Sequence, residues 1–391
     1  MAFRTLMGIT AKFDLETVQI DAVNAFVHCD LDEVVYMRLP PGFTKPGKVL
    51  RLCKALYGLR RSPILWQQSL TESFRELGFR EVPQEPCAML QGGIIVFFYV
   101  DDIVFCYRKR DDAETQRVIR VMQERYQLNI LGELKWFLGI HVLRDRLQKK
   151  LWLSQEAFIE KITNQYGIDT GGRMPDTPMS ELELPPADTR IDAASALRYQ
   201  RKMGSLLYAA ITTRPDVAFA VSRLARSNHN PTPTHHEAVD RVIKFLYGSK
   251  HMAICYGGEG GGPEAQAFIC ASDASFADNT ADRKSSQGYI MMLFNGAISW
   301  RANKQDTVTT SSTEAELLAL SQTAKEGIFL SRLFKALSLD LNEPLTIDCD
   351  NTQTLRLIKE ESAKLVTKLR HVDIHNHWLR QEYGQGRIQL R

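Results

Sequence analysis

No hydrophobic stretch in the sequence is long enough to cross a membrane. The longest apolar run, residues 92–100, is far shorter than the roughly 20 residues that a spanning helix needs. The N-terminus lacks an apolar region followed by a small-residue cleavage site, so we expect no secretory signal peptide. The seven cysteines are scattered and form no Cys-x-x-Cys pair, which argues against a zinc site or a disulfide framework. We therefore predict a protein that is not secreted, has no membrane partner and works in a reducing compartment.

Charge is nearly balanced overall but unevenly distributed. The chain has 391 residues, of which 44% are hydrophobic and 24% charged, as expected for a globular protein of two or three domains. The net charge is +3, yet residues 195–250 contain nine basic and three acidic side chains. This local excess suits a surface that follows a nucleic-acid backbone, although a solvated helix face has the same composition.

Two stretches rich in glycine or proline divide the chain. Residues 257–263 contain five glycines and a proline, a composition that cannot hold a helix or a central strand. A softer boundary lies at residues 171–186, which contain four prolines. These stretches predict three domains, at residues 1–170, 171–263 and 264–391.

Hydrophobic periodicity predicts an α+β, multidomain chain. In the first domain we predict strands over 17–22, 94–99 and 103–107 and helices over 62–77 and 114–126. The middle domain is mainly helical, with helices predicted over 199–210, 216–227 and 235–247. The third is predicted as a mixed α/β sheet with strands over 267–273, 288–294 and 345–349 and a helix over 312–337.

The first group of candidate catalytic residues is a set of three acids. Asp101 and Asp102 lie between two predicted strands, so the pattern indicates a hairpin with the acids at its turn. Asp21 lies near the end of another predicted strand. If the strands are neighbours, three carboxylates converge, which is the ligand set of a pair of Mg²⁺ ions able to activate a hydroxyl and stabilise a leaving pyrophosphate. A solvated turn is the alternative for the Asp-Asp pair alone.

Several ordered motifs extend this pattern along almost the whole chain. They are residues 19–26 (QIDAVNAF), 36–43 (YMRLPPGF), 52–63 (LCKALYGLRRSP) with Trp66, 99–102 (YVDD), 132–140 (GELKWFLGI) and 213–220 (TRPDVAFA). Together they closely resemble the reverse transcriptases in the Pol polyproteins of copia-type LTR retrotransposons. The resemblance implies an RNA-directed DNA polymerase with a right-hand palm, a partial fingers region, and a helical thumb or connection.

The resemblance also implies residue roles, and each role has an alternative. Asp21, Asp101 and Asp102 would bind the metal ions, and Phe26 would exclude a ribose 2′-hydroxyl from the nucleotide site. The remaining implied roles are nucleotide binding by Tyr57 and Gly58 and a primer grip formed by Trp136, Phe137, Leu138 and Gly139. Phe26 and Trp136 could equally be core aromatics, and Arg60 and Arg61 are either phosphate contacts or solvated charges.

A second group of acids occurs in the third domain. Asp273 ends a predicted strand, Asp350 follows another, and Glu316 lies on the predicted helix, with Ser311 or Ser312 as its N-cap. A strand-end acid, a helix acid and a second strand-end acid form the arrangement of an RNase H active site. The resemblance implies Glu316 rather than Glu314, because residues 316–319 (ELLA) match the helix register of the family, and Glu314 should point to a different face. Asp350 is chosen over Asp348 on similar grounds, since it lies just beyond the strand with Asn351 after it. The motifs 283–289 (RKSSQGY) and 371–374 (HVDI) resemble the RNase H domain of the same elements.

Three histidines in the third domain form a further candidate metal site. The spacing of His371 and His375 suits zinc on a helix, but only Asp373 offers a further ligand, and His377 adds none at ligand spacing. We expect a helix near the substrate with partly exposed histidines instead.

The resemblance implies the remaining components of the system. The cofactors would be Mg²⁺ or Mn²⁺, two ions in each active site, and the ligands an RNA/DNA template–primer, dNTPs and an RNA–DNA hybrid. Protein partners would be other parts of the same polyprotein or a second copy of the chain, in cytoplasmic virus-like particles or the nucleus.

Two departures from the family pattern bear on activity. Only 20 residues precede Asp21, and we find no counterpart of a final RNase H helix with a fourth carboxylate. We therefore expect a truncated copy with reduced or no activity. A non-catalytic remnant that binds nucleic acid through residues 195–250 is the main alternative, and a chain that does not fold stably is a third.

Overall fold

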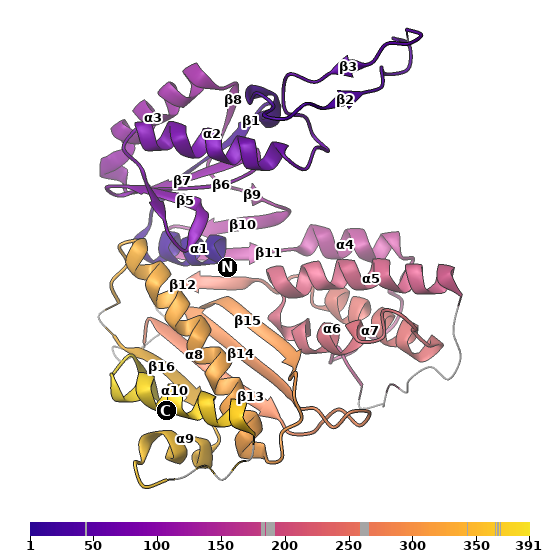
Figure 1. Ribbon diagram of the computed structural model, residues 1–391, viewed down its shortest axis with the longest axis vertical. Helices are drawn as coiled ribbons and strands as arrows, with labels where there is room; N and C mark the ends of the chain where they lie inside the picture. The colour runs from indigo at the N-terminus through magenta and orange to yellow at the C-terminus, as the bar shows by residue number, and fades with distance from the viewer. Residues whose placement is uncertain are drawn as a thin grey trace. The chain divides into compact units, whose positions relative to one another are not determined.

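The computed structural model describes residues 1–43, 45–180, 184, 192–258, 266–341, 343–363, 365, 367 and 369–391. Two compact units account for these residues. Unit 1 comprises Met1–Lys12, Lys135–Ser331 and Asp340–Arg391, and unit 2 comprises Phe13–Leu134 and Arg332–Leu339. Helices and sheets occur in both units (Figure 1), as the predicted α+β multidomain class requires.

Unit 2 is built on a six-stranded sheet with the order β4-β5-β6-β7-β1-β8. Its strands are β1 (Glu16–Ala22), β4 (Arg80–Val82), β5 (Glu85–Gln91), β6 (Ile94–Tyr99), β7 (Asp102–Tyr107) and β8 (Leu128–Gly132). Strands β6 and β7 form the predicted hairpin, and β1 pairs with β7 in antiparallel fashion. The runs of β-branched and aromatic residues in β6 and β7 are almost wholly buried, as expected for central strands.

Two helices, α2 (Ser62–Glu76) and α3 (Asp112–Arg125), lie against this sheet (Figure 1). Their apolar faces place Trp66, Phe74 and Met122 in one core with sheet residues such as Ile20 and Phe105. Helix α2 begins with a proline in its first turn and ends before Gly78, whose φ of +90° is left-handed, so local sequence sets both its ends.

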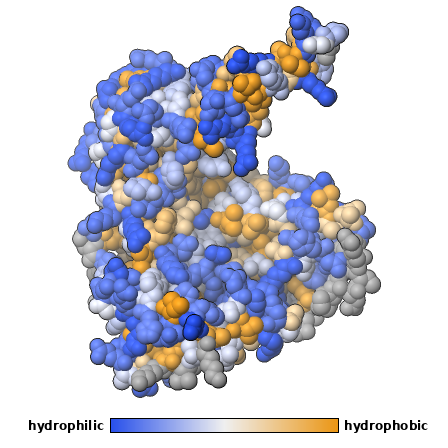
Figure 2. Space-filling model, viewed as in Figure 1, coloured by the Kyte–Doolittle hydropathy of each residue, from blue (hydrophilic) through white to orange (hydrophobic). Residues whose placement is uncertain are grey.

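A short hairpin of β2 (Tyr36–Met37) and β3 (Leu50–Arg51) also belongs to unit 2. The strands, the loop between them and the segment just before β2 leave large apolar side chains exposed, and Figure 2 shows apolar residues beside polar ones on this hairpin. These side chains are Val34, Tyr36, Phe43, Val49 and Leu50.

Unit 1 contains a four-stranded sheet that sequence periodicity missed. Its order is β12-β11-β10-β9, formed by β9 (Trp136–Phe137), β10 (Ile140–Asp145), β11 (Lys150–Ser154) and β12 (Ile254–Gly257). Gly257 therefore ends a strand, whereas we predicted that it begins a linker; residues 259–263 of that linker lie outside the described residues. A Cβ on Gly257 would lie 2.1 Å from the Lys149 carbonyl oxygen, so only glycine fits this pairing.

A second sheet in unit 1 has five strands in the order β15-β14-β13-β16-β17. They are β13 (Phe268–Ser275), β14 (Ser286–Leu293), β15 (Gly296–Lys304), β16 (Leu345–Cys349) and β17 (Ile388–Leu390). Strands β13 to β15 are antiparallel, while β13, β16 and β17 run parallel. The long helix α8 (Ser312–Ala336) packs on this sheet, where a Cβ on Gly327 would meet the Leu345 side chain at 2.8 Å.

The remaining helices of unit 1 are α1 (Ala2–Phe13), α4 (Glu156–Gln165), α5 (Ala193–Thr212), α6 (Ala218–Ala225), α7 (Pro233–Gly248), α9 (Thr352–Lys359) and α10 (Arg370–Gly384). Helices α4 to α7 share one apolar core. Helices α5, α6 and α7 confirm the three helices predicted in the middle of the chain, whereas α4 was not predicted. The Arg214 side chain, 2% exposed, forms an ion pair with Asp216 and donates to Ser249, so part of the 213–220 motif is structural.

The predicted three-domain division and the two compact units follow different boundaries. Strand β12, from the predicted middle domain, pairs with β11 of the predicted first domain. The softer boundary at 171–186 includes residues 181–183 and 185–186, which lie outside the described residues. Among the described residues, no helix is both long and apolar enough to cross a membrane.

Candidate active sites

The three acids of the first group meet at one end of the unit 2 sheet. Asp21 on β1 lies directly opposite Asp102 on β7, and the Ala22 amide donates to the Asp101 carbonyl oxygen at 2.8 Å. The predicted convergence of these acids is therefore present in the fold. Their oxygen atoms do not all approach within 4.8 Å of one another, so the group is more open than a closed metal cage.

The electrostatics of this group favour bound cations. Burial, together with the charges of Asp101 and Asp21, raises the pKa of Asp102 even though the Gln19 amide donates to it at 3.0 Å. Among the described residues, no lysine or arginine forms an ion pair with these three carboxylates. Clustered carboxylates without cationic partners fit divalent metal ions, which supply the missing positive charge.

The turn that presents Asp101 is strained and is supported from α2. Val100 has a φ of +55°, which is costly for a β-branched residue. Trp66, buried in the core, donates from Nε1 to the Val100 carbonyl oxygen at 2.5 Å. The sequence marks Trp66 only as part of a motif, because its bond to the turn joins residues 34 positions apart.

Replacing Trp66 by phenylalanine tests this support. The variant loses one hydrogen bond and some packing, so we expect the free energy of unfolding to fall by about 1–3 kcal/mol. For the polymerase activity that the sequence resemblance implies, we also expect the turnover rate of primer extension to fall more than the KM for dNTP rises, because the turn positions Asp101. Phe74→Leu is the matched control: it lies on the same helix, loses core packing and should leave the rate per folded molecule unchanged. Equal rate losses in both variants would contradict a positioning role.

The predicted nucleotide-binding residues lie beside the acids. Tyr57 is 54% exposed, and its ring centroid lies 4.3 Å from that of Phe26, which is only 5% exposed. Burial and the charges of Asp101 and Asp21 raise the pKa of Tyr57. Gly58 is exposed with a φ of +94°. Phe26 belongs to the core, as its alternative interpretation held, and also contacts Tyr57.

The predicted primer-grip residues surround a turn in unit 1. The Trp136 ring is 47% exposed and stacks on His141 with centroids 4.3 Å apart, which excludes the core alternative. Phe137 is buried, and Gly139, with φ +76°, follows Leu138, whose carbonyl oxygen accepts a hydrogen bond from Tyr208. The role of this turn stays a prediction.

The two arginines of the 52–63 motif have different surroundings. Arg61 forms an ion pair with Asp32 and donates to it from Nε, which favours its interpretation as a solvated, paired charge. Arg60 is exposed.

The second group of acids converges at one edge of the five-stranded sheet. Ser272 pairs with Cys349 in the parallel β13–β16 ladder, so the next residues, Asp273 and Asp350, lie on neighbouring segments. Asp273 is still within β13, where it pairs with Gly288 of β14, whereas Asp350 directly follows the end of β16. Glu316 lies on α8 above them and accepts a hydrogen bond from the Ala274 amide at 3.2 Å. Ligand atoms of Glu316, Cys349 and Asp350 all lie within 4.8 Å of one another.

Glu316 is the electrostatic centre of this group. It is 5% exposed, and its Oε2 atom has no hydrogen-bond partner. Burial raises its pKa to about 7, and the charges of Asp273 and Asp350 act in the same direction. A buried carboxylate with an orphaned oxygen beside two further acids fits a divalent cation.

The acids that we set aside have other partners. Asp348 forms an ion pair with Arg391 at 2.7 Å. Glu314 accepts hydrogen bonds from the backbone and hydroxyl of Thr310, and Ser311 caps the helix by accepting from the Glu314 amide. Burial acts to raise the pKa of Glu314, but hydrogen bonds from Thr367 and Thr310 outweigh it and lower the pKa.

The pH dependence of metal-free stability follows from Glu316. Its folded pKa of about 7 exceeds the ordinary value of 4.5, so its stabilising effect is present below pH 4.5 and is lost as pH rises through 7. In EDTA we expect the free energy of unfolding to fall by up to about 3 kcal/mol between pH 5 and pH 8, measured by urea unfolding.

Two substitutions distinguish the pH effect of Glu316 from the effect of removing any acid of this helix. Glu316→Gln should remove most of the decline and stabilise the metal-free protein at pH 8. Glu314→Gln is the matched control on the same helix, and it should destabilise at pH 8 because Glu314 has its hydrogen bonds as a carboxylate. If the free energy of unfolding fell as much between pH 5 and pH 8 in Glu316→Gln as in wild type, the decline would not come from Glu316.

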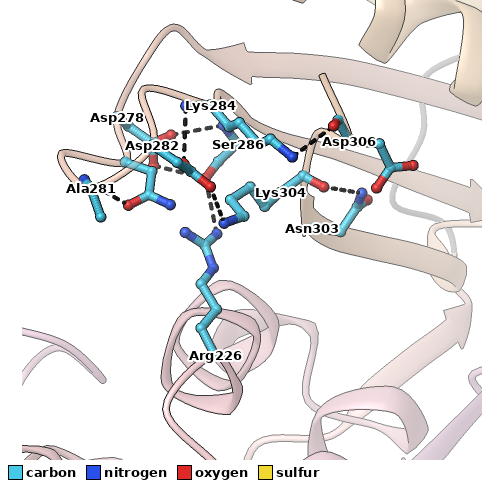
Figure 3. A network of polar contacts seen from close by, with 10 residues as sticks. Arg226, Asp278, Ala281, Asp282, Lys284, Ser286, Asn303, Lys304 and Asp306 are labelled. Carbon is cyan, nitrogen blue, oxygen red and sulfur yellow. Dashed lines mark hydrogen bonds and ion pairs between the residues drawn. The ribbon is translucent and has the colours of Figure 1, made fainter. Parts of the chain in front are cut away.

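The loop that follows Asp273 is held by a polar network within unit 1 (Figure 3). Asp278 accepts from the backbone and hydroxyl of Ser286 at 2.8 and 2.7 Å, and Lys304 forms an ion pair with Asp282 at 2.7 Å. Arg226, from the end of α6, reaches the Ser286 hydroxyl at 3.4 Å. These bonds fix the segment between β13 and β14.

The three histidines lie on α10, the helix predicted for them. His375 forms a hydrogen bond of 2.8 Å with Ser321, and with His371 and Lys325 it lines a pocket of about 280 Å³. His377 lies 3.6 Å from Asp373. Among the described residues, no metal-like cluster of three ligands includes any of these histidines.

Comparison with known proteins places these features in a family. Residues 2–181 match the family described as "Reverse transcriptase (RNA-dependent DNA polymerase)". The chain belongs with the Pol polyproteins of copia-type retrotransposons, and its residues 2–181 match the reverse transcriptase family.

The similar curated proteins agree with that assignment. The retrovirus-related Pol polyprotein from transposon TNT 1-94 of Nicotiana tabacum is 32% identical over 394 residues, covering 97% of this chain and 29% of that protein. The corresponding polyprotein from transposon RE1 of Arabidopsis thaliana is 30% identical over 398 residues, covering 100% of this chain and 26% of that protein. A putative transposon Ty5-1 protein of Saccharomyces cerevisiae is 28% identical over 78% of this chain and its own full length. The chain thus spans less than a third of the two longer relatives.

Proposed function

We propose that the chain is an RNA-directed DNA polymerase with an RNase H domain. The observation that supports the polymerase most strongly is the register that sets Asp21 opposite Asp102, with Asp101 in the adjoining turn. In this proposal residues 1–170 form the palm with partial fingers, 171–263 the helical connection, and 264–391 the RNase H-like domain.

In the polymerase site, Asp21, Asp101 and Asp102 would hold two Mg²⁺ or Mn²⁺ ions. Bound there, the ions would lower the pKa of the attacking 3′-hydroxyl and stabilise the leaving pyrophosphate. The Tyr57 face and the Phe26 ring behind it form a wall for the sugar and base of an incoming dNTP, and Gly58 allows close backbone approach. The turn of Trp136 to Gly139 would hold the primer end.

In the nuclease site, Asp273, Glu316 and Asp350 would hold the metal ions. The orphaned Glu316 oxygen supports this assignment, because a buried acceptor without a partner is costly unless a cation completes it. The three side chains would fix the scissile phosphate of the RNA strand against an activated water. The substrates of the whole chain are then a template–primer, dNTPs and an RNA–DNA hybrid.

Primer extension on a poly(rA)–oligo(dT) template tests the polymerase function. Wild type should incorporate dTTP with Mg²⁺ and not in EDTA. Absence of Mg²⁺-dependent incorporation would refute polymerase activity for this chain. If such a chain still bound duplex, with an affinity that falls steeply as the salt concentration rises, the alternative function of binding nucleic acid without catalysis would replace the polymerase function.

A further inference from the structure

We propose that Glu316, Cys349 and Asp350 form a mixed carboxylate–thiolate site that binds Zn²⁺ more tightly than Mg²⁺. The ligand atoms of these three residues all lie within 4.8 Å of one another. Sequence reasoning found the two acids but missed the thiol. The available signal was a cysteine placed between two aspartates at the end of a strand.

The fold directs the thiol toward the acids. Cys349 ends β16 and is buried, and it lies on the same face of the strand as Leu345, which packs under α8. Glu316 projects from α8 above the same strand end, and its Oε2 atom is buried without a hydrogen-bond partner. A thiol and an unsatisfied carboxylate oxygen therefore share one water-poor space.

Ligand chemistry then selects the cation. Mg²⁺ requires a nearly octahedral set of oxygen ligands, and sulfur is a poor donor to it. Zn²⁺ takes four ligands at about 2.0–2.3 Å and accepts thiolate and carboxylate together, with water in an open position. In a tetrahedron with bonds of that length the ligand atoms lie about 3.3–3.7 Å apart, so these three atoms would need to approach one another by at most about 1.5 Å. On binding, the Cys349 S–H bond breaks, its proton passes to solvent, and the sulfur bonds to the cation.

A bound Zn²⁺ would occupy carboxylates that the proposed nuclease needs. Inhibition of RNA cleavage by Zn²⁺ therefore rests on the proposed function, but the binding itself does not. The two claims are measured separately below.

Cd²⁺ titration of the full, EDTA-treated chain tests the binding, because a thiolate–Cd²⁺ bond has its own ultraviolet charge-transfer absorption. Wild type should develop this absorption, Zn²⁺ should reverse it at comparable concentration, and Mg²⁺ should not. Cys349→Ser should abolish it and weaken Cd²⁺ binding at least about tenfold. Cys53→Ser and Cys270→Ser are matched controls: one removes an exposed thiol and the other a buried thiol on the neighbouring strand β13. Both should bind as wild type.

A second variant keeps the test decisive if Cys349→Ser does not fold. Glu316→Gln leaves the thiol in place, so the absorption should persist but require at least about tenfold more Cd²⁺. No thiolate absorption in wild type, or affinity unchanged in both variants, would overturn the proposal. RNA cleavage with Mg²⁺ alone reports on the nuclease independently, and Zn²⁺ should inhibit it less in Cys349→Ser.

Discussion

Replacing Asp101 and Asp102 together by asparagine is expected to abolish primer extension. The variant keeps the shape of the turn but removes two of the three carboxylates that would hold the metal ions. Losing several kcal/mol of charge stabilisation in the transition state corresponds to a fall in rate of at least about a thousandfold. The measurement is Mg²⁺-dependent dTTP incorporation on poly(rA)–oligo(dT) at saturating template.

The same variant should fold at least as stably as wild type without metal. Burial and the neighbouring acids raise the pKa of Asp102, so the ionised cluster is destabilising and its neutralisation relieves repulsion. Asp30→Asn is the control, because Asp30 forms only an exposed ion pair with Lys54, which contributes little. Incorporation that survives in the double variant at the wild-type rate would rule out these acids as metal ligands.

The second large effect is expected at the proposed nuclease site, where Asp348 in β16 can be compared with Asp350, which directly follows that strand. Asp350→Asn should abolish cleavage of the RNA strand of an RNA–DNA hybrid, because it removes a carboxylate beside Glu316. Asp348→Asn, two residues away, should cleave as wild type, since Asp348 lies in an ion pair with Arg391. Gel analysis of a labelled RNA strand measures both.

Two further variants extend that comparison. Asp273→Asn and Glu316→Gln should lose cleavage to the same degree as Asp350→Asn, since all three acids act as one unit. Equal activity of Asp348→Asn and Asp350→Asn would contradict the chosen register, and absence of cleavage by wild type would contradict the nuclease function.

Local elements of the fold were well determined by the sequence. The hairpin around Asp101 and Asp102 forms where two apolar runs flank a polar pair. Helix α2 has a proline in its first turn and ends just before Gly78. These features depend on side chains close together in the chain, whose preferences act before any tertiary contact exists. The motifs likewise established the family from the order of their residues.

Contacts between distant segments were not determined in this way. No local pattern marks β12, which joins β11 across about a hundred residues, or the short strands of the same sheet. Hydrogen bonds between such strands depend on which apolar faces find each other, so propensity alone does not select them.

The sequence by itself determined which acids to examine and the class of protein that contains them. Only the tertiary structure set Asp21 opposite Asp102, raised the pKa of Glu316 by burial, and placed the Cys349 thiol beside two carboxylates. The physical reason is that distances and desolvation depend on packing between segments far apart in sequence. The chemistry of a residue can be read locally, but its neighbours, and hence its charge state and metal preference, come from the fold.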